Sequence, residues 1–208
     1  MLLATTGQFE LAVYVLCLAI VLDLLDGRAA RALRATSEFG RQLDSFSDAC
    51  SFGVAPALLV YIALLRDLGP VGILVAVVYM LAGVFRLARH NMLSDAHAKA
   101  KRTMGLPIPI AASHLMAITL MRDELPPAVA AGIVVLMAVF MATRWKLPEL
   151  KGVGPVTFLM AIGIVNYLVF VSLPNWYTAG WWTFWNLLIV GAARTEDRRH
   201  ALEISIEH

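Results

Sequence analysis

The sequence has few charged residues and almost no cysteine. Asp, Glu, Lys and Arg make up 15% of its 208 residues, whereas ordinary soluble domains carry about 25%, and this scarcity argues against a soluble protein. The formal net charge of +2 is too small to indicate nucleic-acid binding. The two cysteines, Cys17 and Cys50, fit neither a CxxC motif nor a zinc-ligand spacing. Residues 1–9 contain no basic segment of the kind that starts a cleavable signal peptide.

Apolar residues dominate instead, at 60% of the chain. They form runs near the ~17–25 residues that a transmembrane helix needs. We read seven such runs, at residues 9–25, 48–65, 70–89, 106–121, 126–143, 154–173 and 176–193. The sequence therefore predicts an all-α, polytopic transmembrane helical bundle of about seven spans, followed by a cytosolic tail at residues 194–208.

The basic residues give the expected orientation of this bundle. Of the 17 Lys and Arg residues, all but Arg66 and Arg122 fall in alternate loops, at the end of the span that leads into such a loop, or in the tail. Because cytoplasmic loops carry the excess of Lys and Arg, these loops and the C-terminus are expected in the cytosol. The same pattern puts the N-terminus outside, directly before the first span, which indicates that one N-terminal helix is missing from this sequence.

Four aspartates lie within residues 23–48, in the pattern D-x2-D-G-x2-A-R-x8-G-x3-D-x3-D. Asp23 and Asp26 share a face of one helix, and Asp44 and Asp48 share a face of the next. Acids at membrane depth are costly unless they pair, face a cavity or bind a cation. Carboxylate oxygens suit Mg²⁺, Mn²⁺ or Ca²⁺. The pattern therefore predicts a metal site at the cytosolic interface, where two ions could bridge a diphosphate.

Small and basic residues accompany the acids. Gly27 would let a phosphate or base reach the main chain, and Ala30 and Gly40 are small where two backbones or a nucleotide must approach closely. Arg31 can form a charge-assisted fork to a phosphate. In the alternative interpretation the acids form an interfacial ion network with the nearby arginines, Arg28, Arg31, Arg34 and Arg41.

This motif resembles the signature of the CDP-alcohol phosphotransferases, and every signature position is present. Members of that family cleave the diphosphate of a CDP-alcohol, usually CDP-diacylglycerol, and transfer the phosphatidyl group to a second alcohol with release of CMP. The resemblance implies that residues 1–193 form a transmembrane catalytic domain. It also implies a cofactor, Mg²⁺ or Mn²⁺, in a site for two ions.

The resemblance further implies a role for each signature residue. Asp23, Asp26 and Asp44 would ligand the metals. Asp48 would also lie at the metal centre and would serve as the catalytic base for the incoming hydroxyl. The CDP moiety would be held by Gly27, Ala30, Arg31, Ser37 and Gly40.

Two later segments bear on the acceptor alcohol. FRLAR-x-N at residues 85–91 and GLP-x-P-x-A-A at residues 105–112 resemble the bacterial membrane-type phosphatidylserine synthases, which implies L-serine as the acceptor. Arg86 and Arg89 share a helical face, and either could take the serine carboxylate bidentately. Asn91 could accept the serine ammonium. In the alternative, both arginines are anchors that snorkel to lipid phosphates.

These expectations describe a multi-pass enzyme of the bacterial cytoplasmic membrane with its active site at the cytosolic face. Its partners would be CDP-diacylglycerol, L-serine and membrane lipids, and Gly and Ala on several helix faces are compatible with a homodimer. Glycerol 3-phosphate and inositol remain alternative acceptors. Intramembrane acids also suit an ion-coupled transporter, although these acids form one cluster without a matching second half. A non-catalytic lipid-binding protein is a third interpretation.

Overall fold

The computed structural model describes most of the first 147 residues and part of the segment that follows. The described residues are 1–32, 37–96, 103–144, 146–147, 165, 167–169, 171–175, 177–178, 180–181 and 183–184. The chain divides into two compact units, residues 1–89 with 106–143 and residues 90–105 with 144–208. The predicted spans at 154–173 and 176–193 lie largely outside the described residues, and the tail at 194–208 lies wholly outside them.

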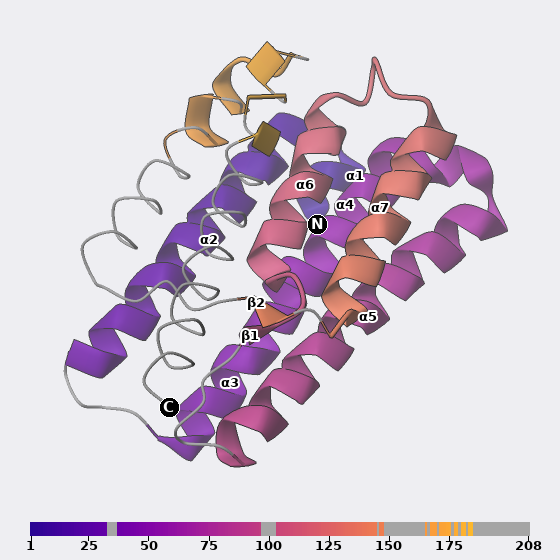
Figure 1. Cartoon of the computed structure of the whole chain (residues 1–208). Coiled ribbons are helices and arrows are strands. Elements are labelled where there is room, and N and C mark those ends of the chain that lie inside the picture. Colours follow the sequence, from indigo (N-terminus) through magenta and orange to yellow (C-terminus); the bar gives the residue numbers. More distant parts are fainter. Residues whose placement is uncertain are drawn as a thin grey trace, which may run out of the picture. The chain divides into compact units, whose positions relative to one another are not determined.

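Helices make up almost all of the described chain (Figure 1). The α-helices are α1 (Leu2–Thr5), α2 (Phe9–Ala32), α3 (Glu38–Asp48), α4 (Ala55–Val60), α5 (Pro70–Ala96), α6 (Ile108–Leu120) and α7 (Pro127–Ala142). Between α3 and α5 the helical run also includes two π-helical turns and one 3₁₀ turn: η1 (Ala49–Val54), η2 (Tyr61–Leu65) and η3 (Arg66–Leu68). The second unit holds an antiparallel pair of two-residue strands, β1 (Thr103–Met104) and β2 (Lys146–Leu147).

Helices occupy the first five predicted spans. The segments Glu38–Leu68 and Pro70–Met92 are long and apolar enough to cross a bilayer by length and composition, while α6 and α7 are shorter apolar helices. These features fit a helical membrane bundle, the predicted class, whereas the number of seven spans stays a prediction. The predicted span 48–65 is the apolar part of a longer helical run that begins at Glu38.

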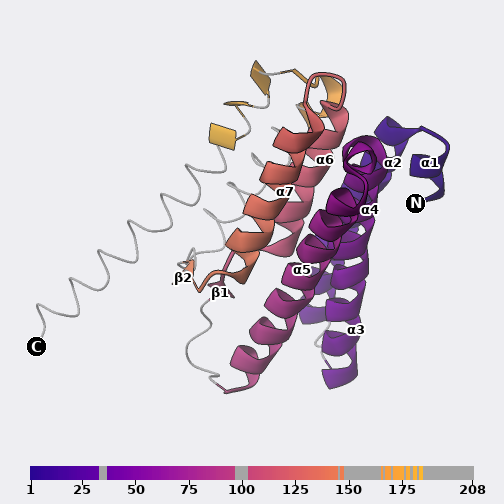
Figure 2. The same cartoon turned by 90° about the vertical axis from the view of Figure 1, so that its right-hand side faces the viewer.

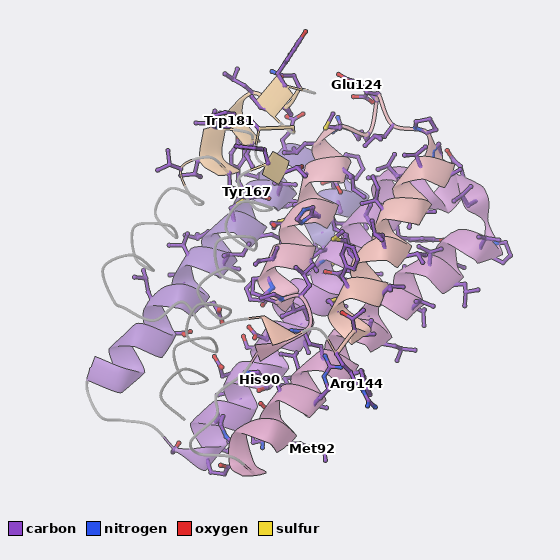
Figure 3. The ribbon with its side chains drawn as sticks, in the orientation of Figure 1. His90, Met92, Glu124, Arg144, Tyr167 and Trp181 are labelled. Atoms are coloured by element: carbon purple, nitrogen blue, oxygen red, sulfur yellow. The ribbon has the colours of Figure 1, made fainter. Side chains whose placement is uncertain are left out.

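Helix α6 is the central helix of the first unit. It packs against α2, η1, α4 and α7, and its residues Ile108, Leu115 and Met116 are fully buried. Its sequence is apolar on all sides, as expected of a helix that is surrounded by others. Figure 2 shows α6 and α7 side by side. The turn that joins them is polar, and Figure 3 shows the exposed Glu124 there.

Two local signals set helix ends in the first unit. The Ser37 hydroxyl caps α3 by accepting a hydrogen bond from the Gly40 N–H at 3.0 Å. Gly69 lies between η3 and α5 with φ +57°, a backbone conformation that glycine adopts without strain. Pro70 then begins α5, where its fixed φ suits the first helical position. The reversal at Gly69 lets α5 return along the helical run that precedes it.

Candidate functional site

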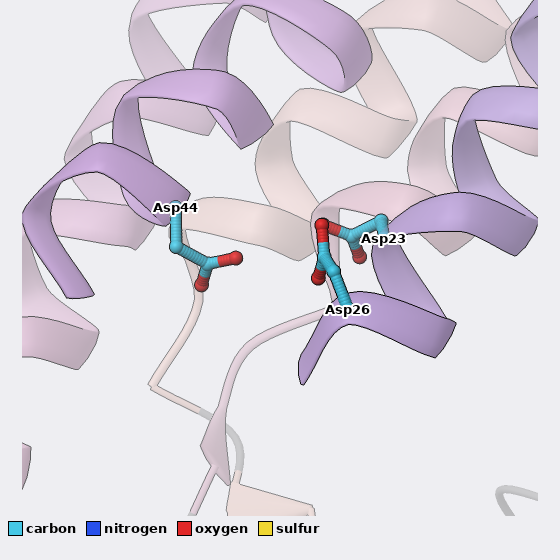
Figure 4. Close-up of side chains that lie close together, drawn as sticks. All are labelled: Asp23, Asp26 and Asp44. Carbon is cyan, nitrogen blue, oxygen red and sulfur yellow. The ribbon is translucent and has the colours of Figure 1, made fainter. Parts of the chain in front are cut away.

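Three aspartates from α2 and α3 converge. One carboxylate oxygen from each of Asp23, Asp26 and Asp44 lies within 4.8 Å of the others. Figure 4 shows Asp23 and Asp26 extending from α2 and Asp44 extending toward them from a separate helix. Asp23 is half-buried, and the other two side chains are exposed. Residues that are about twenty positions apart in the sequence thus meet at one point.

Asp48 ends α3 one turn after Asp44, on the same side of the helix. Its carboxyl is hydrogen-bonded to that of Asp23 and is repelled by the nearby carboxylate of Asp44. Its Oδ1 atom is buried and has no hydrogen-bond partner among the residues that the structure describes. Buried polar atoms are almost always satisfied by protein, water or an ion. This oxygen is therefore where an ion or a substrate group is expected.

The donor set fits a divalent cation. Carboxylates this close repel one another, and a cation between them removes that repulsion. Two oxygens that ligate the same Mg²⁺ are at most about 4.2 Å apart, because Mg–O distances are about 2.1 Å, whereas two ions about 4 Å apart accept a wider set. The three oxygens lie within 4.8 Å of one another, with Asp48 beside them, and the number of ions stays a prediction. The acid cluster could thus bind metal, and its oxygens suit Mg²⁺ and Mn²⁺ alike.

The residues predicted to hold CDP lie next to the acids in the chain. Gly27, Ala30 and Arg31 continue α2 beyond Asp26, and their side chains are outside the described part of the structure. Ser37 and Gly40 form the cap of α3, where a Cβ on Gly40 would lie 3.1 Å from Ser37 Oγ. The cap thus accounts for these two residues locally. The CDP contacts of all five residues stay a prediction.

Arg86 is buried in α5 and lies near Asp48. Its exposed fraction is 7%, and its guanidinium is within electrostatic range of Asp48 and Arg89. Its Nε has no hydrogen-bond partner among the described residues. An arginine that snorkels to lipid phosphates keeps its charged head exposed, which is not the case here. Arg86 therefore offers a buried positive charge beside the acid cluster.

Arg89 has a contact that the sequence did not reveal. Its guanidinium donates hydrogen bonds to three carbonyl oxygens at the end of α7, those of Met141 (3.2 Å), Ala142 (3.0 Å) and Thr143 (2.9 Å). Such carbonyls lack partners within their own helix, and a cation there also complements the helix dipole. Arg89 thus caps α7. Asn91 belongs to the second unit, and the acceptor contacts predicted for Arg89 and Asn91 stay predictions.

Sequence reasoning missed Tyr79 and the π-helical turn η1. Tyr79 is fully buried, and its hydroxyl donates a hydrogen bond to the Phe52 carbonyl oxygen at 3.1 Å. A tyrosine in an apolar span is a usable signal, because a buried phenol needs a partner. No residue pattern in the sequence indicates the π-helical turn.

Comparison with known proteins identifies the family. A sequence model of the CDP-alcohol phosphatidyltransferases matches residues 1–147. The chain belongs to this family. The CDP-diacylglycerol–serine O-phosphatidyltransferase of Helicobacter pylori is 32% identical over 156 residues, which cover 72% of this chain and 65% of that protein. The Bacillus subtilis protein of the same name is 37% identical over 140 residues, covering 67% of this chain and 76% of that protein.

An archaeal protein is similar to the same extent. The archaetidylserine synthase of Methanothermobacter thermautotrophicus is 37% identical over 160 residues, which cover 75% of this chain and 66% of that protein. The present chain thus spans about two thirds of the length of the Helicobacter and archaeal relatives. The resemblance carried by residues 23–48 is confirmed at the level of the family.

Proposed function

We propose that this protein transfers the phosphatidyl group of CDP-diacylglycerol to L-serine, giving phosphatidylserine and CMP. Membership of the CDP-alcohol phosphatidyltransferases supports the reaction class. The relatives described above, bacterial and archaeal, are named for serine or for a serine lipid. The observation that carries the proposal is the buried Arg86 beside Asp48 and the acid cluster. Arg86 would be the cation that binds the carboxylate of the acceptor, and the neighbouring Asp48 would be the base for the acceptor hydroxyl.

The proposed metal is Mg²⁺ or Mn²⁺, in a site for two ions. Asp23, Asp26, Asp44 and Asp48 would hold it, since hard cations prefer oxygen ligands. When bound, it supplies the positive charge that neutralises the diphosphate of the substrate.

Asp48 and Arg86 have different roles toward the acceptor. Arg86 binds the serine carboxylate bidentately and thereby orients the hydroxyl toward Asp48. Asp48 takes the hydroxyl proton while the serine oxygen forms a bond to the phosphatidyl phosphorus. The bond from that phosphorus to the CMP oxygen breaks, and CMP leaves with the bonding electrons. Asp48 needs one oxygen free for the proton, and its buried Oδ1 is suited to that role.

The CDP moiety is assigned to Gly27, Ala30, Arg31, Ser37 and Gly40. Arg31 steadies the diphosphate and the departing CMP through charge-assisted hydrogen bonds. The excess of Lys and Arg in alternate loops supports an active site and a C-terminus on the cytosolic side of the bacterial cytoplasmic membrane.

The test is CMP release by purified protein in mixed micelles of detergent and CDP-diacylglycerol with Mn²⁺. L-serine, glycerol 3-phosphate and inositol are supplied separately, and Asp44→Asn serves as the inactive control. We expect CMP release that depends on L-serine. Release that depends on another alcohol would replace the acceptor and keep the reaction class. Cation flux in liposomes without any CMP release would instead support an ion-coupled transporter.

A further inference from the structure

A π-helical turn follows directly after Asp48. The helical run changes from α3 to η1 at Ala49 and returns to α-helix at Ala55. A π-helical turn holds one more residue than the α-helical turn, since its hydrogen bonds span i to i+5. The extra residue rotates α3, with Asp44 and Asp48, relative to α4. The direction in which the acids extend therefore depends on this turn keeping its π form.

Helix α5 holds the turn through a buried hydrogen bond. The Tyr79 hydroxyl donates to the carbonyl oxygen of Phe52, in the middle of η1, at 3.1 Å. Tyr79 is 0% exposed and Phe52 is 1% exposed, so water does not reach this hydrogen bond and cannot replace it. Removing the Tyr79 hydroxyl would leave the Phe52 carbonyl oxygen buried without a hydrogen-bond donor, which is destabilising.

A close approach of the two main chains lies beside this bond. A Cβ placed on Gly83 would lie 4.0 Å from the Gly53 Cα atom and 2.8 Å from the Ile108 Cδ1 atom. Glycine at position 83 thus lets α5, η1 and the start of α6 meet.

One face of α5 therefore joins the π-helical turn to the candidate site. Tyr79, Gly83 and Arg86 follow one another at i, i+4 and i+7, which is a single helical face. The first bonds η1, the second packs on η1, and the third lies near Asp48. The register that Tyr79 and Gly83 set is the register in which Arg86 lies near Asp48.

We propose that Tyr79 is a positioning residue: by holding the Phe52 carbonyl in the π-helical turn, it keeps Asp48 in register with Arg86. The proposal rests on the roles proposed above for Asp48 and Arg86. Loss of the hydroxyl frees the turn to tighten toward α-helix, which rotates Asp48 about the helix axis and away from Arg86. The reacting hydroxyl and its base then no longer align.

The kinetic test is Tyr79→Phe, which removes one oxygen and keeps the ring. We expect kcat for CMP release to fall between about tenfold and a hundredfold, as misplacement of a reacting group does. The assay uses saturating Mn²⁺, so that a change in metal affinity, which rotation of Asp44 and Asp48 would also cause, does not limit kcat. Tyr14→Phe is the matched control, since Tyr14 is 46% exposed on α2; its kcat should equal that of the wild type.

A double-mutant cycle separates positioning from general destabilisation. In an Arg86→Lys background, Tyr79→Phe should cost less than about threefold, because the pair that Tyr79 aligns is already impaired. An equal fold-loss in both backgrounds, or wild-type kcat in Tyr79→Phe, would overturn the proposal.

A second pair of variants tests the register without touching Tyr79. Gly83→Ala should lower kcat, because its Cβ meets Ile108 Cδ1. Adding Ile108→Val removes that atom and leaves the nearest side-chain carbon at 3.7 Å, an ordinary contact, so activity should return. Failure of Ile108→Val to restore activity would contradict the proposed register.

A cross-linking readout keeps the proposal distinct from the proposed reaction. Asp48→Cys and Arg86→Cys are combined in a chain whose own thiols are removed by Cys17→Ala and Cys50→Ala. A short bifunctional thiol reagent should join the two introduced thiols, and adding Tyr79→Phe should lower the yield severalfold while Tyr14→Phe does not. Unchanged yields would overturn the positioning role. A wild type without CMP release would refute the proposed reaction alone.

Discussion

Arg86 and Arg89 lie one helical turn apart, yet their substitution should have different consequences. Arg86 is 7% exposed and lies near Asp48, so Arg86→Met removes a buried cation from beside the acid cluster. Truncating one partner of a buried charge pair costs about 2–5 kcal/mol. If that interaction serves the acceptor in the transition state, kcat/KM for L-serine should fall about 30-fold to a few thousandfold.

Arg89→Met should act on stability instead. It removes hydrogen bonds to three carbonyl oxygens of α7 at 2.9–3.2 Å. Hydrogen bonds to charged groups contribute about 1.5–3 kcal/mol when desolvated, but Arg89 is only half-buried and water can replace part of them. A net loss of about 1–3 kcal/mol lowers the melting temperature by roughly 2–12 °C.

The assay combines CMP release at varied L-serine with thermal unfolding of the same purified samples. We expect Arg86→Met to lower kcat/KM for L-serine. Its unfolding temperature should fall by less than the same loss of free energy would cause if it all came from stability. We expect Arg89→Met to unfold earlier and to keep the KM for L-serine. An unchanged kcat/KM in Arg86→Met would remove Arg86 from the acceptor site. A raised KM in Arg89→Met without loss of stability would return the acceptor contact to Arg89.

Two other substitutions probe the base and the cap. Asp48→Asn should keep CDP-diacylglycerol binding, measured by equilibrium binding, and should lose turnover because an amide cannot accept the serine proton; turnover like that of the wild type would rule out Asp48 as the base. Ser37→Asp should keep the cap of α3, which contributes about 1 kcal/mol, but should raise the KM for CDP-diacylglycerol by setting a carboxylate beside the diphosphate. An unchanged KM would separate Ser37 from the nucleotide site, and Ser37→Ala, which loses the cap, is the stability control.

The acid cluster could be predicted because its information is local. Asp23 and Asp26 are one helical turn apart, as are Asp44 and Asp48, so each pair shares a face in any helix. The charge distribution put both helix ends on one side of the membrane. The structure brings Asp23, Asp26 and Asp44 within 4.8 Å.

The division between Arg86 and Arg89 could not be predicted in this way. Helical spacing puts both on one face and says nothing of what packs against each. Arg89 meets the end of α7 only because α7, more than fifty residues later, ends beside it. Arg86 is buried, with an exposed fraction of 7%. Both facts belong to tertiary packing, which residue spacing does not encode.

The π-helical turn was invisible for a related reason. Apolar periodicity near 3.6 residues detects an α-helix, and one inserted residue in a mostly apolar run changes that pattern too little to notice. Residue spacing therefore predicts a uniform helix over residues 48–65, although η1 and η2 interrupt it. Two residues of α5 are related to the π-helical turn: Tyr79 through its buried hydroxyl and Gly83 through its close approach. Each residue alone, however, has ordinary explanations in a membrane helix.

Mn²⁺ binding to the purified protein, followed by electron paramagnetic resonance, tests most directly whether the aspartates form a metal centre. The wild type should bind Mn²⁺ saturably, Asp44→Asn should bind it at least about tenfold more weakly, and CMP release should disappear on chelation and return in proportion to bound Mn²⁺. Equal Mn²⁺ binding by wild type and Asp44→Asn, together with CMP release that survives chelation, would contradict a metal centre built from these acids.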